Sequence, residues 1–207
     1  MPDIRQLTLS HKLPSQLQHK MKIKENAGWK RNGEVYVNNG AYCADMSIET
    51  YSTIYTSITG VLFPTSDKEQ KSAVEALQGD HLGRIQFWPS AVKNLTHLLE
   101  STGSKLKTHS MWRYSFYGQK DKLIELFLLN GFSEHHLHQD FFVGFKGKDA
   151  VKAYDIEFSI SENSSENIVL DTKSINIKNH FKFYLVDSNY GLQSKDVCEI
   201  KKLISYR

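Results

Sequence analysis

The chain has 207 residues, with 26 basic and 23 acidic side chains and a formal net charge of +3. This length suits one large domain or two small ones, and the weak basic excess does not by itself identify a nucleic-acid-binding protein. The two cysteines form no C-x-x-C pair, no apolar run approaches the roughly 18 residues that cross a bilayer, and no signal peptide is evident, so we expect a cytoplasmic protein without a membrane partner.

The first half of the chain is predicted to combine short strands with one clear helix. Residues 1–40 are polar and Lys-rich, and their weak periodicity predicts no element. Residues 59–64 and 82–88 look like strands, and residues 68–80 look like a polar loop or a short helix. Residues 89–103 carry apolar side chains at helical spacing between a proline and a glycine, which predicts a helix.

The second half repeats this plan and then becomes richer in strands. A helix is predicted at 120–130, where apolar residues share one face before Gly131. Alternating apolar residues predict strands in the remaining segments, which are 111–117, 140–145, 153–161, 167–177 and 180–186.

This order of elements predicts an α+β fold with mostly antiparallel sheets. We expect an N-terminal ferredoxin-like, or RRM-like, half at residues 1–109, which begins with the polar extension. It would pack against a C-terminal β-rich half at residues 110–207.

The segment from Ser174 to Leu192 carries the most informative motif. Ser174 precedes a His180-Phe181-Lys182 strand, and a Tyr190-Gly191-Leu192 signature follows. A second block, in the same chain order, joins Thr59-Gly-Val-Leu-Phe-Pro64 to Leu82-Gly-Arg-Ile-Gln-Phe87 and a helix ending in Leu98-Leu99.

Together these motifs resemble the subtype I-F family of CRISPR repeat endoribonucleases, which belongs to the repeat-associated RAMP proteins. The resemblance covers about half of the chain. It implies a CRISPR RNA-binding subunit that binds the repeat hairpin and cuts the stem base without a metal or other cofactor, through attack of a 2′-hydroxyl on the adjacent phosphate. It also implies that the protein stays on the 3′ hairpin in an interference complex and contacts a backbone subunit there.

The resemblance also implies roles for individual residues. Ser174 and Tyr190 would orient the reacting groups, and His19, the nearest local match to the family's histidine, would be the general base. Phe181 would stack on the last base pair of the stem. The other expected RNA contacts in the C-terminal half are His180, Lys173, Lys178, Lys182 and Gln193. A catalytically impaired protein that only binds RNA is the first alternative.

A second alternative is a Mg²⁺-dependent nuclease of the PD-(D/E)xK type. Asp155 is followed, after fifteen intervening residues, by Asp171-Thr172-Lys173. Two carboxylates at such a spacing can hold Mg²⁺ while the lysine polarises the attacking water. The histidines in the run Glu134-His135-His136-Leu137-His138 point in divergent directions if the run is a strand or loop, so we expect a solvent-exposed loop there and not a metal site.

Overall fold

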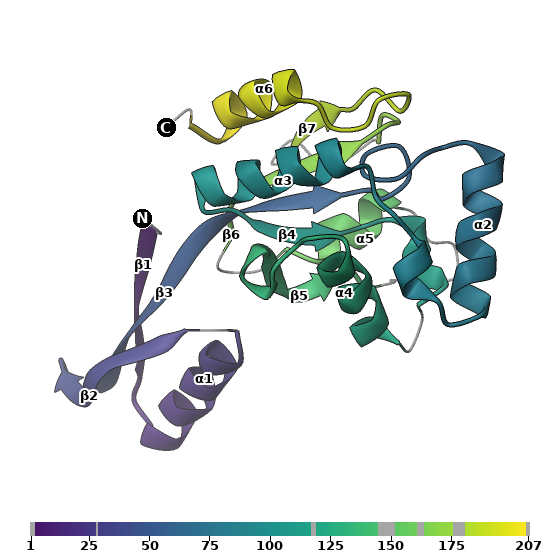
Figure 1. Ribbon diagram of the computed structural model, residues 1–207. Helices are drawn as coiled ribbons and strands as arrows, with labels where there is room; N and C mark the ends of the chain where they lie inside the picture. The colour runs from purple at the N-terminus through teal and green to yellow at the C-terminus, as the bar shows by residue number, and fades with distance from the viewer. Residues whose placement is uncertain are drawn as a thin grey trace. The chain divides into compact units, whose positions relative to one another are not determined.

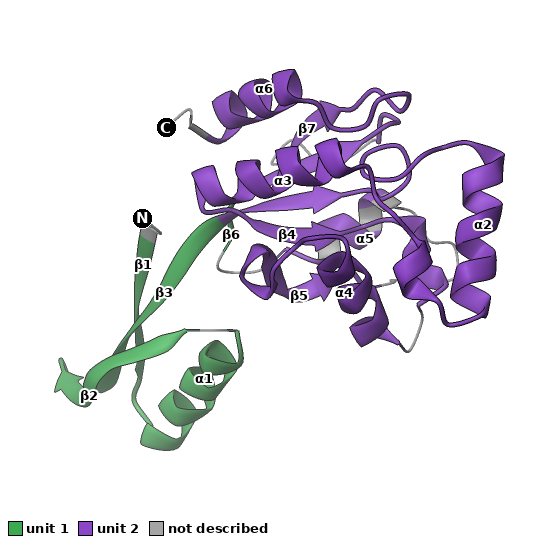
Figure 2. Ribbon diagram, viewed as in Figure 1, with its two compact units in different colours: residues 1–51, 161–165 green, residues 52–160, 166–207 purple. Residues whose placement is uncertain are grey.

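The computed structural model describes residues 3–27, 29–116, 119–144, 152–160, 164–175 and 181–205. The chain divides into two compact units (Figure 2): unit 1 comprises residues 1–51 with 161–165, and unit 2 comprises residues 52–160 with 166–207. The division falls near residue 51, whereas the sequence predicted a boundary at residue 109. The long strand β3 (Ala41–Thr56) contributes residues to both units.

Unit 1 contains a three-stranded antiparallel sheet with a helix packed on one face. β1 (Asp3–His11) and β2 (Lys30–Asn38) each pair with β3, and α1 (Pro14–Asn26) lies between them in the chain. Leu17 and Met21, one helical turn apart, are the buried residues of α1. They pack against alternate residues of β3, namely Ala44, Met46 and Ile48. These contacts form a small core of their own.

β2 lies at the edge of unit 1, and all nine of its residues are exposed. Asn39 and Gly40 have φ values of 50° and 73°, which allows the tight two-residue turn that leads into β3. Pairing with β3 is irregular between Asn32 and Tyr36, where Gly33 has a φ of 78°. β2 is therefore a bulged edge strand.

Unit 2 is built on strands that pair in parallel. The sheet order is β5-β4-β3-β6-β7, and the four strands not yet described are β4 (Lys105–Thr108), β5 (Leu137–Phe142), β6 (Ser164–Asp171) and β7 (Phe181–Leu185). β4 is parallel to both β3 and β5, and β7 is parallel to β6. The structure is thus a mixed α/β fold.

The prediction of mostly antiparallel sheets is wrong for unit 2. Residues 167–171 of β6 are buried without interruption, because helices cover both faces of this sheet. The ferredoxin-like arrangement at residues 1–109 is not confirmed either. Residues 1–51 supply one helix and three antiparallel strands, and residues 52–109 belong to the parallel unit.

Helices of unit 2 lie on both faces of its sheet, and α2 (Asp67–Gln78) lies beyond the ends of β3 and β4 (Figure 1). Ile54 and Leu170 belong to one hydrophobic core with apolar residues of α2, α3 (Pro89–Thr102), α4 (Lys120–Leu129) and α6 (Ser194–Ser205). The face with Tyr55 and Val169 contacts Ile156 of α5 (Lys152–Phe158). No helix in the described part of the chain is long and apolar enough to cross a membrane.

Two of the predicted helices are confirmed and several predicted strands are wrong. The segments 89–103 and 120–130 contain α3 and α4, and Gly103 ends α3 in the left-handed conformation. The predicted strands at 111–117, 82–88 and 153–161 instead contain two 3₁₀ helices and α5. Residues 59–64 form a turn with a single β-bridge. The elements β1, α1, β2, β3, β4 and α6 were not predicted.

Candidate functional site

The strands of unit 2 end at one edge of their sheet, which we call the carboxyl edge. The N–H of Ser57, just after β3, donates to the carbonyl of Leu170 near the end of β6 (3.0 Å). The N–H of His109, just after β4, donates to the carbonyl of Thr56 (3.1 Å). Since β5 and β7 are parallel to β4 and β6, their ends lie at this edge too. The carboxyl ends of all five strands therefore lie at this edge.

A tight turn follows β3 and packs against two other loops of the carboxyl edge. The carbonyl of Ile58 accepts hydrogen bonds from the N–H groups of residues 61–63, at 2.8 to 3.2 Å. Gly60 has a φ of 79°, and a Cβ atom there would lie 2.5 Å from Cγ2 of Thr172 and 3.1 Å from Cβ of Ser188. Only glycine permits this close approach of the three loops.

The loop after β4 contains a short 3₁₀ helix, η2 (Met111–Tyr114), and is tied to the turn after β3. The hydroxyl of Ser110 accepts the N–H of Trp112 (3.4 Å) and caps η2. The Trp112 indole N–H donates to Oγ1 of Thr59 (2.9 Å), and its ring packs edge-on against Phe63 at 5.1 Å. These two contacts of Trp112 therefore hold the loop after β4 against the turn after β3.

Beneath these loops, His109 connects the ends of β4 and β6. Its Nε2 atom lies 3.2 Å from the carbonyl oxygen of Leu170, and its Nδ1 atom lies 3.7 Å from Oδ2 of Asp171. A carbonyl can only accept, so Nε2 must carry a proton. The ring of His109 thus joins the carbonyl of Leu170 by a hydrogen bond and turns Nδ1 toward the carboxylate of Asp171.

Arg113 forms a second buried ion pair close to the carboxyl edge. Its guanidinium donates to Oδ2 of Asp155 on α5 (3.1 Å), and both side chains are fully buried. It also donates to the carbonyls of Ser110, Val143 and Gly144. One side chain thus holds the loops after β4 and β5 and the helix α5 together, because the guanidinium has five donors in a fixed plane.

Lys107 is a buried cation on the face of the sheet that α5 covers. Its side chain is 1% exposed, and Nζ donates to the carbonyl of Ser159, just after α5 (2.6 Å). Burial lowers the pKa of Lys107 to about 8, and the negative charge of Asp140 partly opposes this shift. Nζ also lies 6.0 Å from the ring centre of Tyr55. This lysine anchors α5 and does not reach the carboxyl edge.

The three residues expected to be catalytic belong to two different units. Ser174 is exposed in the loop after β6, and Tyr190, which is 64% exposed, lies in the loop after β7. Both loops belong to the carboxyl edge. His19 lies on the exposed side of α1 in unit 1.

The residues expected to contact RNA differ in their surroundings. Lys173 is exposed beside Ser174, whereas Phe181 is 6% exposed and packs edge-on against Tyr55 at 5.8 Å. The proposed stacking of Phe181 on a base pair is therefore wrong, because its ring belongs to the core. Lys182 binds the carbonyl of Leu203 and the carboxylate of Glu166.

Gln193, Lys178 and His180 are the remaining residues that were predicted to contact RNA. The backbone N–H of Gln193 donates to Oδ2 of Asp196 (2.8 Å) at the start of α6, and its side chain is half-buried. Lys178 and His180 lie outside the described residues.

The alternative Mg²⁺ site is not assembled as a nuclease core would require. Asp155 lies on the helix α5 and not on a strand, and its carboxylate is bound by Arg113. Asp171 accepts the backbone N–H groups of Thr172 (2.7 Å) and Lys173 (3.4 Å), while Lys173 is exposed. The two carboxylates are thus engaged separately, by a guanidinium and by a loop. We reject the PD-(D/E)xK reading on these contacts.

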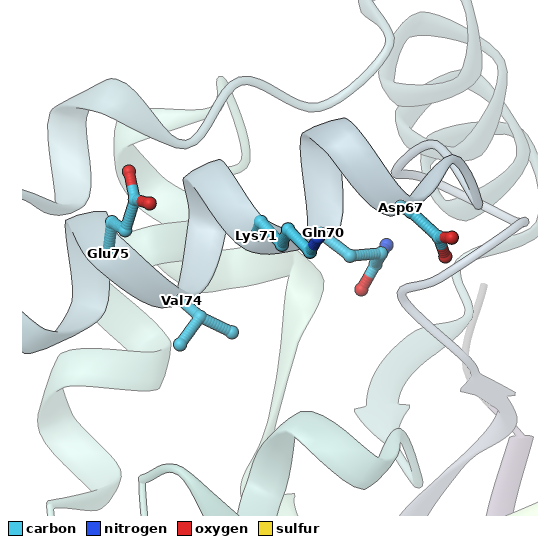
Figure 3. Close-up of a pocket in the computed structure, with 5 residues that line it drawn as sticks. All are labelled: Asp67, Gln70, Lys71, Val74 and Glu75. Carbon is cyan, nitrogen blue, oxygen red and sulfur yellow. The ribbon is translucent and has the colours of Figure 1, made fainter.

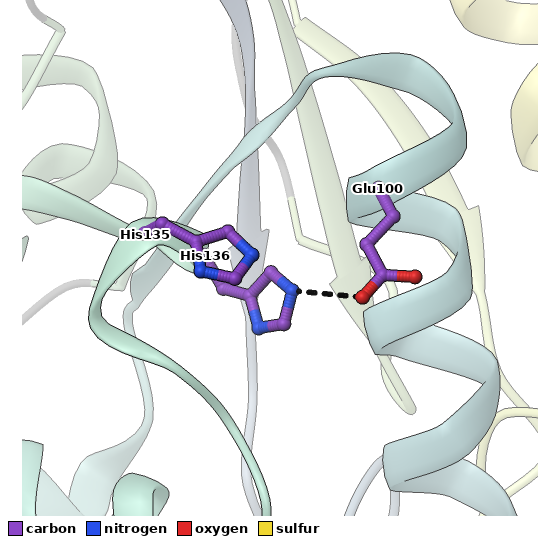
Figure 4. A group of neighbouring side chains, drawn as sticks. All are labelled: Glu100, His135 and His136. Atoms are coloured by element: carbon purple, nitrogen blue, oxygen red, sulfur yellow. Dashed lines mark ion pairs between the residues drawn. The ribbon is translucent and has the colours of Figure 1, made fainter.

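Glu100, His135 and His136 form the cluster shown in Figure 4, and their ligand atoms lie within 4.8 Å of one another. The N–H of Ser133 donates to Nδ1 of His136 (3.1 Å), so the proton of a neutral ring is on Nε2. That atom lies 3.4 Å from Glu100 Oε1. A metal would need the lone pair that this proton occupies. We therefore interpret His136 as a cap of the 3₁₀ helix at residues 134–136, where it accepts the N–H of Ser133, and not as a metal ligand.

A hollow beside α2 is the other feature outside the carboxyl edge. It is lined by residues of this one helix, namely Asp67, Gln70, Lys71, Val74 and Glu75 (Figure 3). A single helix face offers no converging groups from a second element, so we assign no ligand to it.

Sequence reasoning missed Ser57, His109 and Arg113. The run of residues 52–56, which is rich in Ser, Thr and Ile, directly precedes Ser57-Ile-Thr-Gly60, and that order is typical of a buried strand that ends in a loop. Reading residues 59–64 as a strand hid this boundary. His109 and Arg113 had no sequence signal, because their partners lie 42 to 62 residues away.

No family model, no curated protein and no solved structure matches this chain.

Proposed function

We propose that this protein binds a phosphate-bearing ligand, RNA above all, at the carboxyl edge of unit 2. The observation that carries the proposal is the strand order β5-β4-β3-β6-β7. From β3 the chain proceeds to β4 and β5 on one side, and then returns to β6 and β7 on the other. Ligands of open parallel sheets bind where the strand order reverses in this way, outside the carboxyl ends of the strands.

The side chains at this point suit an anion. Thr59, after β3, is half-buried and Lys173, after β6, is exposed, whereas the hydroxyl groups of Ser57 and Ser110 are buried beneath them. Hydroxyl groups and a lysine are common phosphate ligands. The nearby carboxylate of Asp171 accepts the backbone N–H groups of Thr172 and Lys173. The edge therefore offers the Thr59 hydroxyl and the Lys173 ammonium group to a phosphate.

RNA is the phosphate-bearing ligand favoured by the resemblance to CRISPR repeat endoribonucleases. Ser174 and Tyr190 belong to the same edge, which is compatible with roles in positioning an RNA backbone. Metal-independent cleavage, the repeat hairpin as substrate, the backbone subunit as partner and the cytoplasmic location remain predictions. Binding without cleavage is the alternative to cleavage, and RNA cleavage assays distinguish the two.

The proposal is tested by titrating the protein with a labelled RNA and, separately, with uridine monophosphate in EDTA. Lys173→Ala is expected to weaken both interactions, because it removes the exposed cation of the edge. Lys202→Ala is the matched control, since Lys202 is exposed in the last turn of α6 and pairs with Glu199. Absence of binding by the unmodified protein, or equal losses in the two variants, would refute the proposal. Cleavage of the RNA in EDTA would show that the site is also catalytic.

A further inference from the structure

We infer that the carboxyl edge takes an unpaired stretch of nucleic acid, whose bases stack on Tyr114 and Tyr190 and whose phosphates contact Lys173. The inference rests on the proposed function and names the form of ligand. It differs from recognition of a hairpin stem, in which the bases are already stacked on one another.

Large exposed side chains at the carboxyl edge support this inference. Met111 is 50% exposed and Tyr114 is 43% exposed in the loop after β4, and Tyr190 is 64% exposed in the loop after β7. The two exposed tyrosine rings offer surfaces on which unpaired bases can stack. An aromatic ring offers every base a flat surface, so it favours bases without demanding a sequence.

The order of these groups along the edge also fits a strand of nucleic acid. Across β4, β3, β6 and β7 the loops present Tyr114, then the hydroxyl of Thr59, then Lys173, then Tyr190. Three strand spacings separate the outer two loops, or about 14 Å at ~4.8 Å each. A few unpaired nucleotides can bridge this distance, with phosphates near the centre and bases at the two ends.

The charge of the edge argues against a duplex. A duplex presents two phosphate backbones, and proteins that grip it use several Lys or Arg residues. Among the described residues of the edge, Lys173 is exposed while Arg113 is buried against Asp155, and the exposed Asp187 follows β7. Stacking on two rings beside Lys173 suits a single strand better, because its bases are free to leave one another.

The test compares labelled single-stranded oligouridine RNA with the same RNA annealed to its complement, by fluorescence anisotropy in EDTA. We expect the single strand to bind at least tenfold more tightly. Tyr190→Ala should weaken its binding about 5-fold to 150-fold, the usual range for one stacked base. Tyr190→Phe keeps the ring and should bind nearly as the unmodified protein does. Leu129→Ala, at an exposed apolar position ending α4, is the control and should change nothing.

The possible failures can be told apart by adding uridine monophosphate as a competitor. If it binds at a site sensitive to Lys173→Ala, but the duplex binds as well as the single strand, the inference is wrong and the proposed function stands. Equal binding by Tyr190→Ala and the unmodified protein would likewise overturn the inference. If neither the monophosphate nor either RNA binds, both proposals fail.

Discussion

Replacing the buried Lys107 by methionine should change how the stability of the protein depends on pH. In the folded protein the pKa of Lys107 is about 8, below the ordinary value of 10.5, because its ammonium group is removed from water. The folded state therefore binds fewer protons than the unfolded state between these two values. The contribution of Lys107 to stability is complete above pH 10.5 and is lost as the pH falls through 8.

The size of the effect follows from the two pKa values. Linkage gives a cost of about 3 kcal/mol for protonated Lys107 at pH 7 and about 1.4 kcal/mol at pH 9.5. The free energy of unfolding of the unmodified protein should thus rise by roughly 2 kcal/mol relative to Lys107→Met over this interval. The variant also loses the hydrogen bond to Ser159, which contributes about 1.5 to 3 kcal/mol when the amine is charged and about 0.5 to 1.5 kcal/mol when it is neutral.

Urea unfolding of both proteins at several pH values between 7 and 9.5 measures this difference directly. Other titrating groups affect both proteins alike, so the difference isolates Lys107. Parallel curves over the whole interval would show that the lysine keeps its ordinary pKa in the folded protein, and would refute the reasoning from burial.

Three further changes test other parts of the structure. Gly191→Ala should lower the free energy of unfolding, measured in urea, by about 2 to 4 kcal/mol, because Gly191 has a φ of 66° and a Cβ atom would overlap the Trp88 ring. Gly103→Ala is the control. It has open space around it and should lower the free energy of unfolding by only about 1 kcal/mol. Asp155→Asn leaves a buried guanidinium without its counter-charge and should cost about 3 to 5 kcal/mol, while a value below 1 kcal/mol would show that the pair is not buried in solution. Zn²⁺ should bind no more tightly to the unmodified protein than to His136→Asn in equilibrium dialysis, and a loss of zinc specific to the variant would contradict the assigned proton on Nε2.

Local signals predicted the helices better than the strands. The helix α3 could be predicted because Leu95, Leu98 and Leu99 share one face and Gly103 ends it, and these are properties of neighbouring residues. α5 was taken for a strand because its residues alternate in polarity. Its buried Ala153 and Ile156 are three apart, as helical packing requires, but this became evident only with the sheet beneath them.

The candidate site could be predicted only in part, for a similar reason. Lys173, Ser174 and Tyr190 were singled out from a motif, and the structure places their loops at one edge of the sheet. The glycine of that motif has a structural explanation, since Gly191 lies against Trp88. The site itself depends on the order in which strands pair, and no local pattern in the chain encodes that order.

The bulge in β2 has a consequence for the solubility of the protein. An edge strand with unpaired backbone groups can recruit another chain and begin aggregation. If β2 were a flat strand, Val35 and Val37, which are 38% and 64% exposed, would favour its pairing with a strand of another chain. Gly33, with its positive φ, breaks the regular ladder, and Lys30 and Arg31 add like charges that keep a second copy away. The irregular backbone at Gly33 thus opposes the pairing of β2 with a second chain, which is the step that begins a fibre.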